Sequence, residues 1–167
     1  MGRITLKLNT LPKNLEELQA MPQAALTDPE EVAALTVAAL ARYPQDPAAA
    51  AAMLDYLRGP RPLNGMDKQF LKDRFRGKDY LMRSYFYGAT PENNYTPALP
   101  YRVDISENPY SRSQIAEGYL TLYVSCGGAD SPRPLKLRCK PSTGQWFLWE
   151  QQLLAGIRIP QEADPWA

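Results

Sequence analysis

The sequence predicts an α+β fold in which N-terminal helices, a helical hairpin plus a third helix, pack on a C-terminal antiparallel β-sheet of about four to five strands. Apolar residues recur at helical spacing between residues 15 and 76, and from residue 101 onward they alternate with polar residues, as in half-buried strands. A chain of 167 residues has the size of one domain. We therefore expect a single domain over residues 1–167, with a mainly helical layer (1–78), a mainly antiparallel sheet (79–159) and a tail (160–167).

The N-terminal part begins with a strand signal and continues with helix-start signals. Residues 4–8 alternate apolar and polar side chains, which predicts a short strand that can pair with the later sheet. Asn14 precedes a short helix with acidic residues in its first turn. Two longer helices start at Asp28-Pro29 and Asp46-Pro47, where a capping residue precedes a proline in the first turn. Because two or three residues separate these helices, we expect an antiparallel hairpin.

A proline-stiffened turn, residues 58–63, leads to the third helix. Asn64 caps this helix, which we expect over residues 66–76, with Gly77 as its C-terminal stop. The period then changes from helical to alternating, which indicates a strand over residues 80–85. A loop from Gly88 to Pro100 follows.

The remaining chain predicts the sheet, with strands over residues 101–105, 118–126, 133–140 and 145–151. The last of these is apolar on both faces, so we expect it to be central or covered by helices. A hairpin that turns near Asp130 would place Cys139 opposite about Thr121 and Cys126 opposite about Pro134. The two thiols are then too far apart for a disulfide, which predicts free cysteines and agrees with a reducing compartment.

Charge and composition exclude several classes of function. With 19 Lys and Arg against 18 Asp and Glu, the chain has little net charge, so nucleic acid is an unlikely default partner. The chain has no histidine, which excludes Ser-His-Asp and Cys-His catalysis and zinc sites with histidine ligands. No glycine-rich phosphate loop is present, and two cysteines are too few for a thiolate metal site. We predict no catalytic residues, no metal and no cofactor, and only carboxylate chemistry is left open to an enzyme.

The chain carries no signal for secretion or membrane insertion. The N-terminus lacks the apolar segment and small-residue cleavage site of a secretory signal. The longest apolar candidate is the alanine run at residues 48–52, far short of a membrane span. We therefore expect a cytoplasmic protein without a membrane partner.

One candidate ligand site combines the loop at residues 90–97 with aromatic residues on either side. Asn93 and Asn94 place amide groups between two prolines, and a pocket between helices and sheet would draw on Tyr85, Asn93, Asn94, Tyr95 and Trp146. The alternative is a packed loop whose side-chain amides satisfy its own backbone groups.

A second candidate is an aromatic and basic surface on the sheet. Lys136, Arg138 and Lys140 alternate along one strand and can face Tyr119, Thr121 and Tyr123 on its neighbour. Such a surface can stack nucleotide bases or bind an anionic polymer. The alternative, which the small net charge favours, is a solvated face on which lysine and arginine side chains cover tyrosine rings.

Five segments carry a resemblance to a known family: 59–63, 67–71, 89–97, 130–134 and 145–150. Over about residues 15–167 the chain resembles an uncharacterised domain family of Firmicutes, many of them gut bacteria. The resemblance implies a small stand-alone or modular bacterial protein of unknown function and assigns no role to any residue. Separately, the strand, turn and Gly144–Leu148 are similar to the last hairpin of many cone-shaped α+β folds that enclose a pocket.

Three hypotheses follow from these observations. The first is a non-enzymatic interaction module that presents rigid, proline-framed aromatic loops to a protein partner. The second is a small-ligand pocket, or a histidine-free enzyme, between the helices and the sheet. The third, which ranks last, is binding of RNA or single-stranded DNA to the tyrosine and lysine face.

Overall fold

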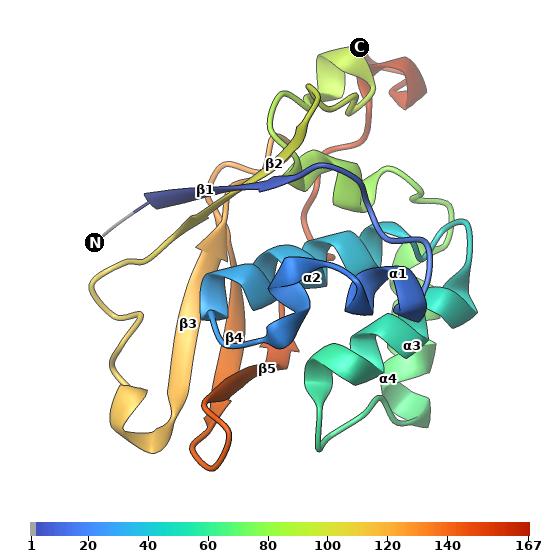
Figure 1. The fold of residues 1–167 in the computed structure, drawn as a ribbon. Helices are drawn as coiled ribbons and strands as arrows, with labels where there is room; N and C mark the ends of the chain where they lie inside the picture. Colours follow the sequence, from blue (N-terminus) through green and yellow to red (C-terminus); the bar gives the residue numbers. More distant parts are fainter. Residues whose placement is uncertain (1–2) are drawn as a thin grey trace.

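The computed structural model describes residues 3–167 and has the α+β architecture expected from the sequence (Figure 1). The helices and strands follow one another as β1 (Arg3–Leu8), α1 (Leu15–Gln19), α2 (Pro29–Ala41), α3 (Pro47–Arg58), α4 (Gly65–Phe75), β2 (Tyr101–Ser106), β3 (Tyr119–Val124), β4 (Arg133–Lys140) and β5 (Gln145–Gln151). Short 3-10 helices lie between and after them: η1 (Pro22–Ala25), η2 (Leu81–Tyr85), η3 (Pro91–Asn93), η4 (Ile115–Glu117) and η5 (Gln161–Ala163).

The helices begin where the capping residues predict. The Asp28 side chain accepts a hydrogen bond from the backbone N–H of Glu30, and Asp46 accepts one from Ala49, each at 3.0 Å. Asn64 forms a reciprocal capping box with the residue three positions on. Each cap satisfies an N–H group that the helix itself leaves without a partner.

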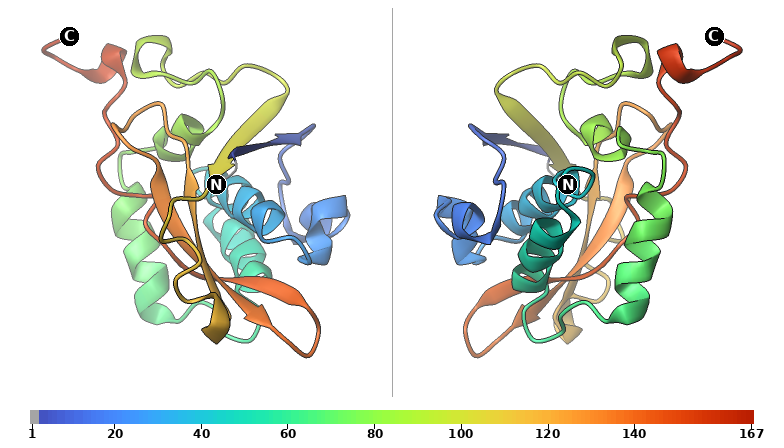
Figure 2. Two further views of the ribbon diagram at one scale, coloured as in Figure 1. Left: turned by 90° about the vertical axis from the view of Figure 1, so that its left-hand side faces the viewer. Right: turned by 90° about the vertical axis from the view of Figure 1, so that its right-hand side faces the viewer.

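The five strands form one antiparallel sheet in the order β1-β2-β3-β4-β5. β1 pairs with β2 along its whole length, whereas β2 pairs with β3 only at Ile105–Val124 and Ser106–Tyr123. The sheet bends where the pairing is so short. In Figure 1, β1 and β2 cross the upper part of the molecule, whereas β3, β4 and β5 lie below them, with β3 nearly upright. Figure 2 shows the same bend from both sides.

α2 lies in the hollow of the bent sheet and is buried on all sides. Every residue from Val32 to Leu40 is at most 1% exposed. An α-helix that is apolar around its whole circumference is typical of a protein core. The helical spacing of the sequence predicts an apolar stripe on α2, made by Val32, Leu35, Thr36, Ala39 and Leu40. This stripe is buried but is only part of the buried surface. The side chains of this helix fill the concave side of the sheet, which is where cone-shaped folds hold a pocket.

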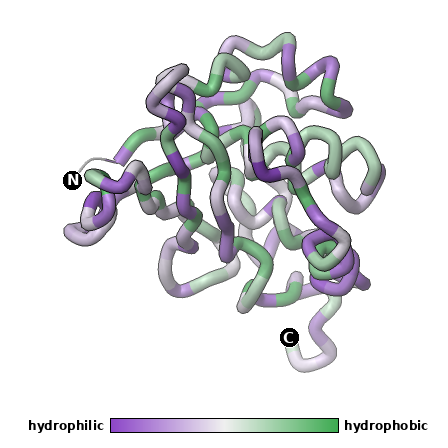
Figure 3. Tube along the Cα trace, turned by 90° about the horizontal axis from the view of Figure 1, so that it is seen from below, coloured by the Kyte–Doolittle hydropathy of each residue, from purple (hydrophilic) through white to green (hydrophobic). Residues whose placement is uncertain are grey.

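The other helices extend the core away from the sheet. α3 runs opposite to α2, as the predicted hairpin requires, and α4 lies behind α3 in Figure 1. The ring of Phe75 at the end of α4 stacks on Tyr43, with ring centroids 4.7 Å apart. One buried apolar cluster includes residues from Leu18 to Leu154 and so draws on both the helical part and the sheet. Figure 3 shows hydrophilic and hydrophobic residues interchanging along the whole chain rather than separating into blocks.

The strand predicted at residues 80–85 is wrong, because the segment forms the 3-10 helix η2. Leu81, Met82, Ser84 and Tyr85 are all buried, so the alternation of the sequence does not separate a buried from an exposed face. The segment packs against α2. The Ser84 hydroxyl donates to the carbonyl of Leu81 at 2.5 Å, which closes the turn locally. Burial by tertiary contacts has overridden the period-2 pattern.

The predicted register of the β3–β4 hairpin is also wrong. The backbone N–H of Cys139 bonds to the carbonyl of Gly118 at 2.8 Å, rather than lying opposite Thr121. Cys139 therefore lies opposite Gly118, three residues from the predicted partner Thr121. The connecting loop packs elsewhere: Gly127 donates its N–H to the carbonyl of Ser84 at 2.8 Å. Both cysteines are nevertheless free, as predicted.

β5 lies at the edge of the sheet, and α2 and α3 cover its inner face. The sequence predicts that this strand is either central in the sheet or covered by helices, and the structure shows the second arrangement. Along residues 3–167, no helix is long and apolar enough to cross a membrane.

Candidate functional site

Cations and aromatic rings lie together on the outer face of β3, β4 and β5, as the strand alternation predicts. Tyr119 pairs with Arg138, and Thr121 with Lys136. Tyr123 pairs instead with Pro134 and faces no cation. Lys140 lies beyond the start of β3, near the turn into β5, so it faces no tyrosine. The structure thus brings together three of the five predicted surface residues: Tyr119, Lys136 and Arg138.

Two residues that the sequence analysis missed complete this surface. Trp149 of β5 lies on the same face, and Arg61 reaches it from the turn between α3 and α4. We call the five residues Arg61, Tyr119, Lys136, Arg138 and Trp149 the basic–aromatic face. Trp149 could have been predicted, because it lies two residues after Phe147 and strand alternation therefore places both on the same face of β5. No local signal placed Arg61 there, because its position depends on how the turn packs.

Cations and rings alternate across the basic–aromatic face. The Arg61 guanidinium lies 3.7 Å from the centroid of the Trp149 ring, and that of Arg138 lies at 4.8 Å. Arg138 also lies 5.2 Å from the Tyr119 ring, and Lys136 Nζ lies 5.6 Å from it. The two rings meet edge to face at 5.5 Å. Each contact is within the range of cation–π attraction or aromatic pairing, so the row is held together by its own members.

A groove of about 410 Å³ opens between this row and the α3–α4 turn. Apolar groups form much of its lining, and cationic side chains surround them. The lining residues are Arg58, Pro60, Arg61, Arg138, Cys139, Lys140, Pro141, Phe147, Leu148 and Trp149. Its volume is within the usual range for sites that bind small molecules or short segments.

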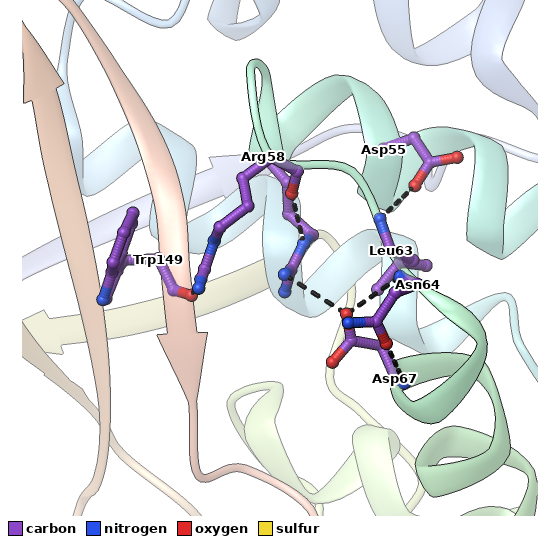
Figure 4. A network of polar contacts seen from close by, with 7 residues as sticks. Asp55, Arg58, Leu63, Asn64, Asp67 and Trp149 are labelled. Atoms are coloured by element: carbon purple, nitrogen blue, oxygen red, sulfur yellow. Dashed lines mark hydrogen bonds and ion pairs between the residues drawn. The ribbon is translucent and has the colours of Figure 1, made fainter.

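The wall of the groove is a turn held by polar contacts (Figure 4). Arg58 donates from Nε to the carbonyl of Arg61 at 2.9 Å and forms an ion pair with Asp67 at 3.4 Å. Burial lowers the pKa of Arg58, while Asp67 acts in the opposite direction. Asp55 accepts a hydrogen bond from the backbone N–H of Leu63 at 2.8 Å. These contacts fix both ends of the turn, so the groove exists before any partner arrives.

The same turn and the segment before α2 cover the free edge of β5. The Arg61 guanidinium donates to the carbonyl of Trp149, and the backbone N–H of Trp146 donates to the carbonyl of Leu26, at the end of η1, at 2.7 Å. Gly59 has a φ of +60° and lies against Phe147, whose ring a Cβ at Gly59 would meet. A larger residue there would push the turn away from the strand. Covering an edge strand in this way protects it from pairing with other chains.

The loop at residues 90–97 is packed through its own hydrogen bonds. Asn93 donates to the carbonyls of Gly88 and Thr96 and accepts from the N–H groups of Thr90 and Thr96. Asn94 has a left-handed backbone, with φ of 56°, and its carbonyl accepts from Arg83. The side-chain amide of Asn93 is thus fully used within the loop, as the packed-loop interpretation predicts.

The aromatic residues of the first candidate site lie apart from one another. The hydroxyl of Tyr85 donates to Leu153 and that of Tyr95 to Arg158, each at 2.5 Å, and both rings are buried. Burial raises the pKa of Tyr85 well above its usual range and that of Tyr95 to about 12. Trp146 lies at the other end, at the start of β5, beside Leu26. No hydrogen bond or ring contact within residues 3–167 joins Trp146 to the two tyrosines.

A smaller hollow, of about 270 Å³, lies beside Tyr85 between η2 and the β3–β4 loop. Ser84, Cys126 and Asp104 contribute to its lining. The Cys126 thiol lies 3.3 Å from the Ser84 hydroxyl. Burial by itself would raise the pKa of Asp104, but hydrogen bonds from Thr5 and Arg3 and the positive charge of Arg3 lower it overall. Asp104 therefore serves as an ionised anchor for β1.

Acidic residues elsewhere are committed to structural contacts. Glu107 pairs with Arg112, and Asp130 pairs with Arg158, each at 2.8 Å. At the start of α2, the pKa of Glu30 is raised to about 7. The larger cause is a hydrogen bond with Asp28, and the second is burial. No group of three or more acidic or cysteine side chains in the described part of the chain is placed to hold a metal ion.

Comparison with protein families identifies the domain but not its activity. A family model described as a domain of unknown function (DUF6935) matches residues 10–161. The chain belongs to this family. All four α-helices and strands β2 to β5 of this DUF6935 domain lie within the matched range, as do both walls of the groove. No curated protein and no solved structure matches the chain.

Proposed function

We propose that this DUF6935 protein is a non-enzymatic protein-interaction module whose contact surface is the basic–aromatic face and the adjoining groove. The main observation is the alternating row of cations and rings, in which four residues lie on three neighbouring strands and Arg61 reaches them from the α3–α4 turn. Arg61 and Arg138 are exposed, and the rest of the row is partly exposed. Tryptophan, tyrosine and arginine dominate the binding energy of protein interfaces. A row of these residues on a strand scaffold loses little conformational entropy when it binds.

The setting that we propose is the cytoplasm of a bacterium of the Firmicutes, with the chain acting as one domain. Two free thiols suit a reducing compartment. The single buried cluster that unites helices and sheet supports one folding unit. The bacterial source rests on the resemblance of the five segments named above.

Site-specific photo-crosslinking in the cells that produce the protein tests the proposed surface. The photoreactive amino acid p-benzoylphenylalanine replaces Thr121, which lies on the outer face beside Tyr119, and in a control it replaces exposed Lys72 on α4. We expect discrete protein adducts from position 121, identified by mass spectrometry, that disappear when Arg138→Glu is added. Equal adducts from both positions, or none from position 121, would contradict the proposal.

A small-ligand pocket is the second candidate, and the hollow beside Tyr85 favours it. Its lining brings a thiol, a hydroxyl and a carboxylate within reach of one cavity of about 270 Å³. A thermal-shift screen against metals, nucleotides and sugars tests this candidate, because a ligand at 100 times its dissociation constant stabilises by about 2.7 kcal/mol. A shift that Cys126→Ser or Ser84→Ala abolishes would support it, and flat curves throughout would count against it.

A further inference from the structure

The rim of the groove carries positive charge that the protein itself does not neutralise. Neighbouring basic residues have acidic partners: Arg58 pairs with Asp67, and Lys136 lies 3.9 Å from Glu150. Arg61, Arg138 and Lys140 have no carboxylate within ion-pairing distance among residues 3–167. The chain as a whole has a net charge of only +1, so this rim is a local feature. It attracts an anionic group at short range rather than any polyanion from a distance.

The aromatic rings beside the rim are already occupied by cations. Trp149 contacts two guanidinium groups, and Tyr119 contacts Arg138 and Lys136. Nucleotide bases bind single-stranded nucleic-acid proteins by stacking on open rings. The rings of Trp149 and Tyr119 already contact cations. We therefore expect them to orient the guanidinium groups rather than to stack on bases. The guanidinium N–H groups that have no partner within the protein can then donate hydrogen bonds to a carboxylate, which arginine binds in a paired, planar geometry.

The interior of the groove is lined by apolar side chains, so it suits an apolar group of a ligand. Pro60 of the α3–α4 turn and Pro141 of the β4–β5 turn both line it, and the ring of Phe147 lies against Gly59. A carboxylate alone would leave this apolar surface exposed to water. A ligand that combines an apolar side chain with flanking carboxylates satisfies both the interior and the rim.

We infer that the groove binds an acidic peptide segment in which one apolar side chain enters beside Phe147 while carboxylates on either side meet Arg61 and the Arg138–Lys140 rim. This inference rests on the proposed function and names the chemistry of the partner. The partner segment is then short and extended, because the groove lies between one turn and one hairpin. Binding weakens as salt rises, since the rim is exposed to solvent.

Fluorescence polarisation with a defined probe tests the inference. The probe is a short fluorescein-labelled peptide with one leucine between two pairs of aspartates. Arg138→Gln and Lys140→Gln should each weaken binding about three- to ten-fold, as loss of a charge-assisted contact implies. Lys72→Gln, which removes the same charge from exposed α4, should leave binding unchanged. Arg138→Lys should fall between wild type and Arg138→Gln, because it keeps the charge but loses the paired geometry.

Two altered probes separate the parts of the site. Replacing the aspartates with asparagines tests the rim, and replacing the leucine with serine tests the interior; each change should weaken binding at least several-fold. No binding of the original peptide, or equal weakening by Lys72→Gln, overturns the inference. Tighter binding of a single-stranded oligothymidylate at the same surface also overturns it and points to nucleic acid.

The two proposals fail in different ways. If adducts form at position 121 but no acidic probe binds, the interaction surface stands and the acidic segment is wrong. If the probe binds and no protein adduct forms in cells, the groove recognises carboxylates but the protein-interaction function is wrong.

Discussion

The enclosure of α2 can be tested at Ala34, which lies on the side of the helix opposite the predicted apolar stripe. Ala34 is 0% exposed, although an amphipathic surface helix would leave this position in water. Ala34→Leu replaces a methyl group with an isobutyl group inside close packing. Overpacking of this kind costs about 1–3 kcal/mol. For a chain of this length, each kcal/mol lowers Tm by about 2–4 °C, so Tm should fall by about 2–12 °C.

Urea unfolding followed by circular dichroism measures the effect, with Ala48→Leu on α3 as the matched control. Ala48 is exposed, and alanine and leucine have similar helix propensities, so the control should change stability by less than about 0.5 kcal/mol. Ala34→Leu should lower the urea midpoint without changing the slope, because the surface exposed on unfolding is nearly the same. If the two variants were equally stable, α2 would be open on that side and its burial on all sides would be refuted.

Three further predictions concern the loops and the titrating carboxylates. Gly127→Ala should cost about 1–3 kcal/mol in urea unfolding, because a Cβ would meet a backbone carbonyl, whereas Gly65→Ala has open space and should be neutral; equal stabilities would contradict the packing of the loop. The lowered pKa of Asp104 stabilises the fold above the ordinary aspartate pKa, and this contribution is lost as pH falls through the lowered value. The stability difference between wild type and Asp104→Asn should therefore narrow in acid, and a difference independent of pH would be the contrary result. The raised pKa of Glu30 contributes to the free energy of unfolding. This contribution is fully present below about pH 4.5 and is lost as pH rises through about 7. Glu30→Gln should thus be more stable than wild type at about pH 8, by less than about 1 kcal/mol because the group is partly exposed. Identical pH profiles for the two proteins would contradict the raised pKa of Glu30.

The helix starts and most strands are predictable because their causes are local. Asp28, Asp46 and Asn64 cap helices through side-chain bonds to residues two or three positions away. Strand alternation likewise depends on which face of one segment is buried. Such signals are present in the sequence itself, so α+β architecture and the helical hairpin follow from it.

The errors arise where contacts between distant segments decide the outcome. η2 is buried against α2, and this burial removes the exposed face that alternation requires. The β3–β4 loop bonds to η2 through Gly127 and Ser84, a contact between distant segments that no local pattern reveals. The enclosure of α2 is hidden for a related reason. Alanine at positions such as 34 is compatible with either a buried or an exposed face, so only the surrounding elements decide.

The candidate site combines predictable and unpredictable parts in the same way. The positions of Tyr119, Lys136 and Arg138 follow from strand alternation, which places them on one face. Trp149 lies on that face through its position in β5, whereas Arg61 joins it only because the α3–α4 turn folds over β5. The groove exists through this packing, which the sequence does not express as a spacing or motif.

The turn that builds the groove also protects the sheet edge, and this double role decides which variants can probe function. Arg61 covers the free backbone of β5 by bonding to Trp149, so replacing it both removes a rim charge and uncovers the edge. A loss of binding in an Arg61 variant would therefore not separate recognition from folding. Arg138 and Lys140 are exposed, and no hydrogen bond or ion pair joins either side chain to another residue in the described chain. Weakened binding in their variants, with unchanged urea unfolding, isolates the contribution of the rim itself.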